Sequence, residues 1–441
     1  MEVVVKIAQL ILSLSILVII HEFGHFLFAK VFNTRVEKFY LFFNPSFSLF
    51  KFRKGETEYG MGWIPLGGYV KISGMIDESM DREQMKKPPQ PYEFRSKPAW
   101  QRLLIMLGGV MMNFLLAILI YASILFVWGE QYLPTEHVNE KGFMADSLAE
   151  TVGFQDGDRI LSVNGKRIER FSGIYQEILL ERPATVQVER NGIQKNIHIP
   201  DSIFPRLLKD PGFLQPRYPA TVGQIPKDSP AKETGLQKGD VIVGVNDTNV
   251  DFYDQLSAAL NQHKGEQVRL QVKRNGELTE LDAPVDQDGK LGIYITGGNL
   301  GKYYDLASKD YSFLAAIPAG VGKGVETFKS YIKQLGLIFT PKTEAYKEVG
   351  SFITIGKIFP GVWNWQAFWN LTAFLSIMLA IINVLPIPAL DGGHVMFLLY
   401  EIVSGQKPGD KFLEYAQIVG MLIVFSILIF ALGNDIVRHI F

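Results

Sequence analysis

The feature that most constrains this chain is an apolar stretch, residues 7–29, that is interrupted by His21, Glu22 and His25. A helix of that length rises about 35 Å, enough to cross a bilayer core of about 30 Å. An ionisable side chain near the centre of such a helix costs at least about 2.5–3.5 kcal/mol, so it needs a partner. We therefore predict a membrane-spanning helix that carries a functional site.

The three polar residues form the pattern His-Glu-Phe-Gly-His. Residues i and i+4 share one face of a helix, so His21 and His25 can present two imidazoles to one zinc ion. Glu22 then lies beside the metal as a candidate general base. A chance match among seven histidines is the alternative, but burial in a membrane helix favours the metal site.

Composition places this helix in a larger membrane protein. The chain has 441 residues, 47% of them hydrophobic, with a net charge of −1. Three further uncharged apolar blocks, 103–128, 367–390 and 416–434, bring the predicted transmembrane helices to four. Near-neutral charge argues against a nucleic-acid partner. The absence of cysteine excludes disulfides and thiolate metal ligands.

Basic residues set the predicted orientation. By the positive-inside rule the segment 30–102 is cytoplasmic, and both termini and the long segment 129–366 lie outside. The basic residues that support this are Lys30, Arg35, Lys38, Lys51, Arg53, Lys54, Lys71, Arg82, Lys86, Lys87, Arg95, Lys97 and Arg102.

Glycines punctuate β-prone residues between Gly60 and Gly74, which predicts a hairpin or looped strand that is apolar enough to dip into the membrane. This β-region either connects two helices or offers an edge strand to an extended substrate. The candidate substrate-contacting residues are Gly60, Gly62, Gly67, Gly68 and Tyr69.

The outer segment contains an internal repeat. Residues 153–164 match residues 235–246, and the segments 188–192 and 272–276 both end in Asn-Gly. Two copies of one small domain are therefore expected, each with a turn at Asn-Gly between two strands.

After the repeat, apolar residues recur at helical spacing through residues 311–340, with lysines between them. This pattern is typical of an amphipathic helix on the outer membrane surface, or else of a core-packed helix in an outer domain. A cluster of aromatic residues then predicts an interfacial belt at the start of the third membrane helix; its members are Trp363, Trp365, Phe368 and Trp369.

A catalytic zinc site needs a third protein ligand. Pro386 and Pro388 end the third membrane helix, and Asp391 and His394 follow as candidates. The first and third membrane helices run in the same direction, so their later ends meet on one side of the membrane. Asn383, about two turns before Asp391, either stabilises an oxyanion or bonds a neighbouring helix.

Each copy of the repeat resembles a circularly permuted bacterial PDZ domain. In that resemblance the ligand-facing loop comes last, at residues 212–214 and 292–294. Pro211 and Pro216 flank the first loop, so Gly292 and Ile293 of the second fit the pattern better. Such a groove binds a peptide by strand addition; the alternative is that both copies serve only as a bulky screen.

The chain resembles the site-2 protease family of intramembrane metalloproteases. The resemblance rests on the zinc motif, the stretch from Asn383 to Gly392, the four helices and the outer repeats taken together. The resemblance implies His21, His25 and Asp391 as zinc ligands, Glu22 as catalytic base, and substrate contacts by Asn383 and the β-region. It also implies cleavage of a pre-trimmed, single-pass anti-sigma factor or of remnant signal peptides, at the bacterial inner membrane with the repeats in the periplasm.

The expected architecture is thus a four-span α-helical membrane protein with a membrane-associated β-region and tandem α+β PDZ domains. Two other functions stay open: a membrane PDZ scaffold with an inactive metal site, and a metal transporter. The expected segments are 1–32, first helix; 33–102, cytoplasmic β-region; 103–128, second helix; 129–217 and 218–300, PDZ domains; 301–366, amphipathic helix; 367–394, third helix and Asp-Gly turn; and 395–441, fourth helix.

Overall fold

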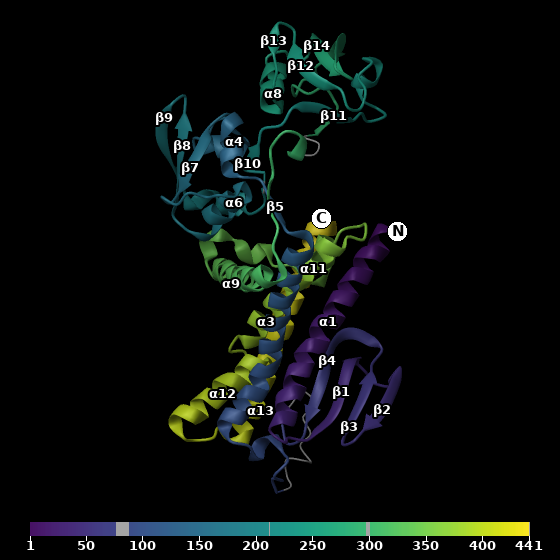
Figure 1. Cartoon of the computed structure of the whole chain (residues 1–441), viewed down its shortest axis with the longest axis vertical. Helices are drawn as coiled ribbons and strands as arrows, with labels where there is room; N and C mark the ends of the chain where they lie inside the picture. Colours follow the sequence, from purple (N-terminus) through teal and green to yellow (C-terminus); the bar gives the residue numbers. More distant parts are fainter. Residues whose placement is uncertain (76–87, 211, 297–299, 441) are drawn as a thin grey trace. The chain divides into compact units, whose positions relative to one another are not determined.

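The computed structural model describes residues 1–75, 88–210, 212–296 and 300–440 (Figure 1). The chain divides into two compact units. The first, here called the membrane unit, holds residues 1–129, 310–339 and 345–441, and the second, the repeat unit, holds residues 130–309 and 340–344.

Within the described residues, four helices are long and apolar enough to cross a membrane, as the sequence predicts. The second of them, α3, packs against α1 and α11. The backbones of α1 and α3 come close where two glycines meet: a Cβ on Gly24 would lie 2.2 Å from the carbonyl oxygen of Gly108. The four helices are α1 (Glu2–Val31), α3 (Ala99–Trp128), α11 (Trp365–Val384) and α13 (Asp410–Ile440).

The third span is shorter than the apolar block 367–390. Helix α11 ends at Val384, because Pro386 and Pro388 cannot continue it. A separate helix, α12 (Asp391–Ser404), begins directly at Asp391. The prediction of an Asp-Gly turn that leads into the fourth span was therefore wrong: Asp391 opens a helix, where an acidic residue suits the positive end of the helix dipole.

The β-region is larger than the predicted hairpin. Strands β1 (Val36–Phe43), β2 (Phe50–Lys54), β3 (Thr57–Met61) and β4 (Ile64–Ile72) form one sheet in the order β2-β3-β1-β4. β1 pairs with β3 in parallel and with β4 antiparallel. The sheet lies beside α1, with β4 against the helix (Figure 1).

Helix α9 (Phe313–Ile338) accounts for the predicted amphipathic segment. It packs along α3 in the opposite direction, from Phe313 beside Phe126 to Phe328 beside Phe114. Between these ring pairs a Cβ on Gly320 would lie 2.6 Å from the backbone of Ala122. The small-residue face of α9 thus packs on a transmembrane helix, and its place at the membrane surface stays a prediction.

Helix α13 is held at two places. Near its start, Gly420 abuts the backbone of Pro388, where a Cβ would lie 2.5 Å from the carbonyl group. Near its end, the buried Asp435 accepts hydrogen bonds from Ser351 and Thr354 at the N-terminus of α10 (Phe352–Ile358). α13 is therefore fixed beside the turn that precedes Asp391.

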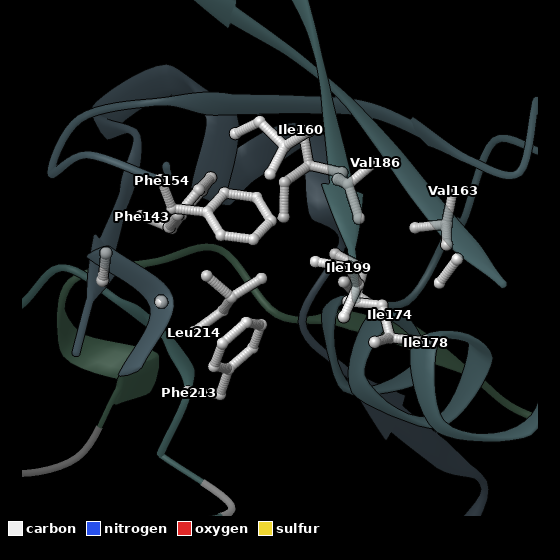
Figure 2. Packing of buried hydrophobic residues seen from close by; sticks show 14 of the residues in the cluster. Phe143, Phe154, Ile160, Val163, Ile174, Ile178, Val186, Ile199, Phe213 and Leu214 are labelled. Atoms are coloured by element: carbon white, nitrogen blue, oxygen red, sulfur yellow. The ribbon is translucent and has the colours of Figure 1, made fainter. Parts of the chain in front are cut away.

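The repeat unit contains two apolar cores. The first is built around Phe143, Phe154 and Phe213, whose rings meet edge to face (Figure 2). Its elements are β5 (Glu130–Tyr132), α4 (Thr135–Lys141), β6 (Phe143–Ala145), α5 (Ser147–Thr151), β7 (Arg159–Val163), α6 (Phe171–Leu180), β8 (Ala184–Arg190), β9 (Ile193–Ile199), α7 (Phe204–Leu207) and β10 (Leu214–Pro216).

The second core is formed by a sheet and a helix. The strands of the sheet follow the order β15-β14-β12-β11-β16, the short β13 pairs with β12, and helix α8 packs on β12. Its elements are β11 (Ala220–Gln224), β12 (Val241–Val245), β13 (Thr248–Asn249), α8 (Tyr253–Asn261), β14 (Gln267–Arg274), β15 (Glu277–Pro284) and β16 (Tyr294–Thr296).

Equivalent contacts recur in the two halves of the repeat unit. Arg190 binds Asp158 through two nitrogens, and Arg274 binds Asp240 in the same way. Each arginine also donates to a backbone carbonyl, that of Gly153 or Gly235. The internal repeat read from the sequence is therefore a structural repeat as well.

One expected boundary needs correction. After the second half the chain returns to the first: Tyr304 is buried in the first core, and β17 (Ala307–Lys309) pairs with β5. The repeat unit accordingly continues past residue 300 to Lys309.

Candidate metal centre

Two imidazoles face each other on α1. His21 and His25 are one helical turn apart, and both are buried. Their Nε2 atoms lie 3.3 Å apart. The spacing in the sequence thus brings the two nitrogens to one point.

Asp391, the first residue of α12, completes a group of three. Its Oδ2 atom lies 3.1 Å from Nε2 of His21 and 3.3 Å from Nε2 of His25. The three ligand atoms all lie within 4.8 Å of one another, and within the described residues this is the group of His and carboxylate side chains that could hold a metal ion.

The chemistry of this group fits zinc. Two imidazole nitrogens and one carboxylate oxygen form a known catalytic zinc set. Asp391 Oδ2 is buried and accepts no hydrogen bond within the described part of the chain, although two nitrogens face it. A buried carboxylate oxygen without a donor is costly, and a cation among the three atoms satisfies it.

The Asp391 carboxyl supplies the anionic ligand of the group. A carboxylate is the form in which an acidic side chain ligates a metal ion, and its negative charge favours a cation at this buried point.

Helix α3 supplies the space and the partners for the imidazoles. A Cβ on Gly109 would lie 2.6 Å from both His21 Cε1 and His25 Nε2, so only glycine leaves room for the rings. His25 Nδ1 lies 2.8 Å from the carbonyl oxygen of Ile105 and donates to it. That bond fixes the tautomer and leaves the lone pair of Nε2 directed at the shared point.

Asn113 holds the other imidazole. It is fully buried, and its side-chain nitrogen lies 3.3 Å from His21 Nδ1, while its Oδ1 atom accepts no hydrogen bond among the described residues. With the amide turned over, Oδ1 accepts from Nδ1–H of His21, and both groups are satisfied. Asn113 was not among the predicted site residues, although an amide inside a membrane span was the available signal.

A cavity of about 570 Å³ opens beside the three residues. Glu22 and Asn383 line it, and the amide nitrogen of Asn383 lies 3.3 Å from Nε2 of His21. His394 lines the same cavity but is not a member of the converging group. Glu22 and Asn383 therefore lie beside the converging group, on the wall of the same cavity.

The predicted β-region residues divide into two sets. Gly67, Gly68 and Tyr69 of β4 line the cavity. Gly60 and Gly62 are not among its lining residues: a Cβ on Gly60 would meet the ring of Tyr40, and one on Gly62 the carbonyl of Phe43, so both serve packing within the sheet. β4 is the last strand at its side of the described sheet, and this edge faces the cavity.

The candidate peptide loops of the repeat unit also differ. Gly292 has a φ of +67°, and the edge strand β16 begins two residues later with the exposed Tyr294. In the first half, Phe213 is fully buried and Leu214 pairs with β6, while Pro211 lies outside the described residues. The strands that follow both loops, β10 and β16, each pair with one neighbour among the described strands, but Phe213 and Leu214 of the first loop are buried whereas Tyr294 after the second is exposed.

Comparison with known proteins gives a consistent assignment. The model of "Peptidase family M50" matches residues 9–427. The regulator of sigma E protease of Haemophilus influenzae is 26% identical, over 98% of this chain and 99% of its own length. The protease RseP of Yersinia pestis is 26% identical over 99% and 100% of the two chains, and the zinc metalloprotease RasP of Oceanobacillus iheyensis 25% identical over 98% and 99%.

These matches confirm the predicted enzyme class and its zinc cofactor, and they cover the helices that carry the converging residues. The chain belongs to peptidase family M50, the site-2 protease family of membrane zinc metalloproteases.

Proposed function

We propose that this metalloprotease cleaves a single-pass membrane protein inside the bilayer, with His21, His25 and Asp391 as the protein ligands of its zinc ion. The observation that carries the proposal is the meeting of these side chains from α1 and α12, each within 3.3 Å of the next, beside a cavity of about 570 Å³. When bound, zinc supplies a Lewis acid that acidifies a water and polarises the scissile carbonyl.

Glu22 acts as the proton acceptor. It follows His21 on α1 and lines the cavity, and its carboxylate takes a proton from the attacking water and returns it to the leaving amine. The amide N–H of Asn383 donates to the carbonyl oxygen of the cleaved bond, where negative charge develops. The buried hydrogen bonds of His25 and His21 to α3 keep both rings from reorienting during these steps.

The edge of β4 presents the substrate. A transmembrane helix hides its carbonyls in its own hydrogen bonds, so it must unwind before cleavage. Backbone groups of Gly67, Gly68 and Tyr69 on the cavity side replace those bonds by strand addition. A Cβ on Gly68 would meet Val18 and the carbonyl of Tyr40, so the strand lies close against α1 and near Glu22.

The substrate we propose is a pre-trimmed anti-sigma factor, with remnant signal peptides as a second class. Two relatives that match over nearly their full length are named regulator of sigma E protease and protease RseP. We place the protein in the bacterial inner membrane with the repeat unit in the periplasm. There the two halves act as PDZ domains that exclude bulky outer domains, and the edge beyond Gly292 and Ile293 binds peptide.

The decisive variant is Glu22→Gln. It should bind zinc as tightly as the wild type and leave a truncated membrane substrate intact, because the amide cannot accept the proton. The matched control is Glu2→Gln, the same change at an exposed position of the same helix, which should cleave normally. Retained cleavage by Glu22→Gln would remove Glu22 from the mechanism, whereas absence of cleavage in the wild type as well would favour a scaffold with an inactive metal site.

The exclusion role is tested separately. Because β17 pairs with β5, the segment to delete is residues 130–309, replaced by a flexible linker. The shortened protease should cleave an untrimmed substrate that the full chain rejects. Unchanged selectivity would refute the exclusion role without touching the assignment of the metal centre.

A further inference from the structure

The β-sheet beside α1 contacts a defined length of that helix. At one end, the hydroxyl of Thr57 donates to the carbonyl of Val36 at 2.8 Å, and the N–H of Thr34 donates to the carbonyl of Ala29 near the C-terminus of α1. At the other end, a Cβ on Gly68 would lie 2.7 Å from Val18. The eleven helical rises from Val18 to Ala29 span about 16 Å of helix. The sheet thus runs from the end of α1 well into its apolar span.

The deep end of the sheet is apolar and exposed. No charged side chain occurs between residues 39 and 50. Phe47, Leu49 and Phe50 are each more than half exposed, and the ring of Trp63 stacks on Phe47 with centroids 5.7 Å apart. Exposed aromatic and aliphatic groups at this depth of a membrane helix suit contact with acyl chains.

The shallow end is basic. Strand β2 lies at the edge of the sheet away from β4, runs from Phe50 at the deep end to Lys54 at the shallow end, and carries Lys51, Arg53 and Lys54, all exposed. Lys54 pairs with Thr57, whose hydroxyl contacts Val36, so Lys54 lies at the level where α1 ends with Lys30. None of the three β2 cations forms an ion pair with another described residue.

Acidic groups near β2 do not cancel this charge. Residues 41–55 contain no Asp or Glu. The exposed Glu56 of the β2–β3 turn and Glu58, the cross-strand partner of Arg53, bring two negative charges against the three positive ones of β2, and Glu58 accepts a hydrogen bond of 2.7 Å from the hydroxyl of Tyr40. Exposed cations directly above an exposed apolar tip match a headgroup layer above acyl chains.

We propose that β2 is a binding surface for anionic phospholipid headgroups, held by Lys51, Arg53 and Lys54 in the leaflet at the C-terminal end of α1. The surface lies at the edge of the sheet opposite the cavity-lining β4 and requires no catalysis. The lipid therefore anchors the sheet from its far side, while β4 stays open to the cavity. Each basic side chain close to an anionic surface strengthens binding by about fivefold.

The test uses the full chain, which contains no cysteine, so one can be introduced alone at Phe52→Cys on β2 and labelled with a fluorophore. The protein is placed in nanodiscs that mix phosphatidylcholine and phosphatidylglycerol, with one lipid brominated at a time to quench the label. We expect brominated phosphatidylglycerol to show at least a fivefold higher apparent affinity than brominated phosphatidylcholine, and the preference to fall as salt is raised.

The matched variants are the triple change Lys51→Gln, Arg53→Gln and Lys54→Gln, and a control with the same loss of charge at the exposed Lys195, Lys227 and Lys232 of the repeat unit. The first should abolish the preference while zinc content, which reports an intact membrane unit, stays unchanged; the control should keep it. Equal quenching by both lipids in the wild type would overturn the proposal. So would protection of the label by a second copy of the chain, detected as energy transfer between two labelled proteins.

Discussion

Gly109 offers the sharpest structural prediction, because it touches both imidazoles without being a ligand. In Gly109→Ala, the new methyl group would lie 2.6 Å from His25 Nε2, whereas ordinary contacts begin at 3.4 Å. Either the new methyl group or the His25 ring must therefore move by about 0.8 Å, the difference of these distances. A metal site tolerates ligand displacements of only about 0.2 Å. We expect zinc affinity to fall at least about 100-fold, or about 2.7 kcal/mol.

The folded state itself should survive this change. Alanine favours a helix interior over glycine by about 0.5–1 kcal/mol, so α3 is not weakened by intrinsic propensity. The matched control is Gly322→Ala on α9, where a Cβ would meet nothing within 4 Å. Zinc affinity is measured on the purified full chain by competition with a chromophoric chelator, with circular dichroism to verify helix content. A Gly109→Ala protein that binds zinc as the wild type does would refute the packing argument.

Three further predictions concern other parts of the chain. Asn113→Leu should lower zinc affinity about 10–100-fold by releasing the His21 ring, and chelator competition measures it; an unchanged value would count against the amide's role. Asp146 has a pKa raised to about 6 by burial and by the neighbouring Asp210, so the folded form holds a proton that the unfolded form has already lost. Local stability should therefore decline as the pH rises from about 4 to about 6. Hydrogen-exchange rates of the backbone amides in residues 143–154, measured across this pH range, report the change in local stability. Asp210→Asn should weaken the dependence of these rates on pH. Phe154→Ala should destabilise the repeat unit by about 3–5 kcal/mol and leave zinc binding unchanged, measured by denaturant unfolding and zinc analysis; a loss of zinc would contradict the separation of the two units.

Patterns that act over short distances in the sequence were predictable. The four spans follow from apolar length, and the helical spacing of His21 and His25 brings their nitrogens to one point. Two helices that run in the same direction place Asp391 on the side of the histidines, and the structure has Asp391 beside both. The internal repeat follows from identical residues, and it reappears as the matched pairs Arg190–Asp158 and Arg274–Asp240.

Features that depend on distant contacts were not predictable. Strand β1 pairs in parallel with β3, and no local turn pattern in the sequence predicts this pairing. Helix α12 is too short and too mixed in composition to stand out beside the fourth span. The return of Tyr304 to the first core depends on packing against buried residues 90 or more positions earlier. The contact of Asn113 with His21 could not be predicted, because it depends on how α3 packs against α1.

The central claim is that α1 and α12 bring two imidazoles and one carboxylate to a single zinc ion. Metal analysis of the purified full chain tests it most directly, through a pair of variants three residues apart on α12. The account predicts one zinc per chain in the wild type and in His394→Ala, and loss of the ion in Asp391→Ala. Full zinc content in Asp391→Ala, together with its loss in His394→Ala, would contradict it.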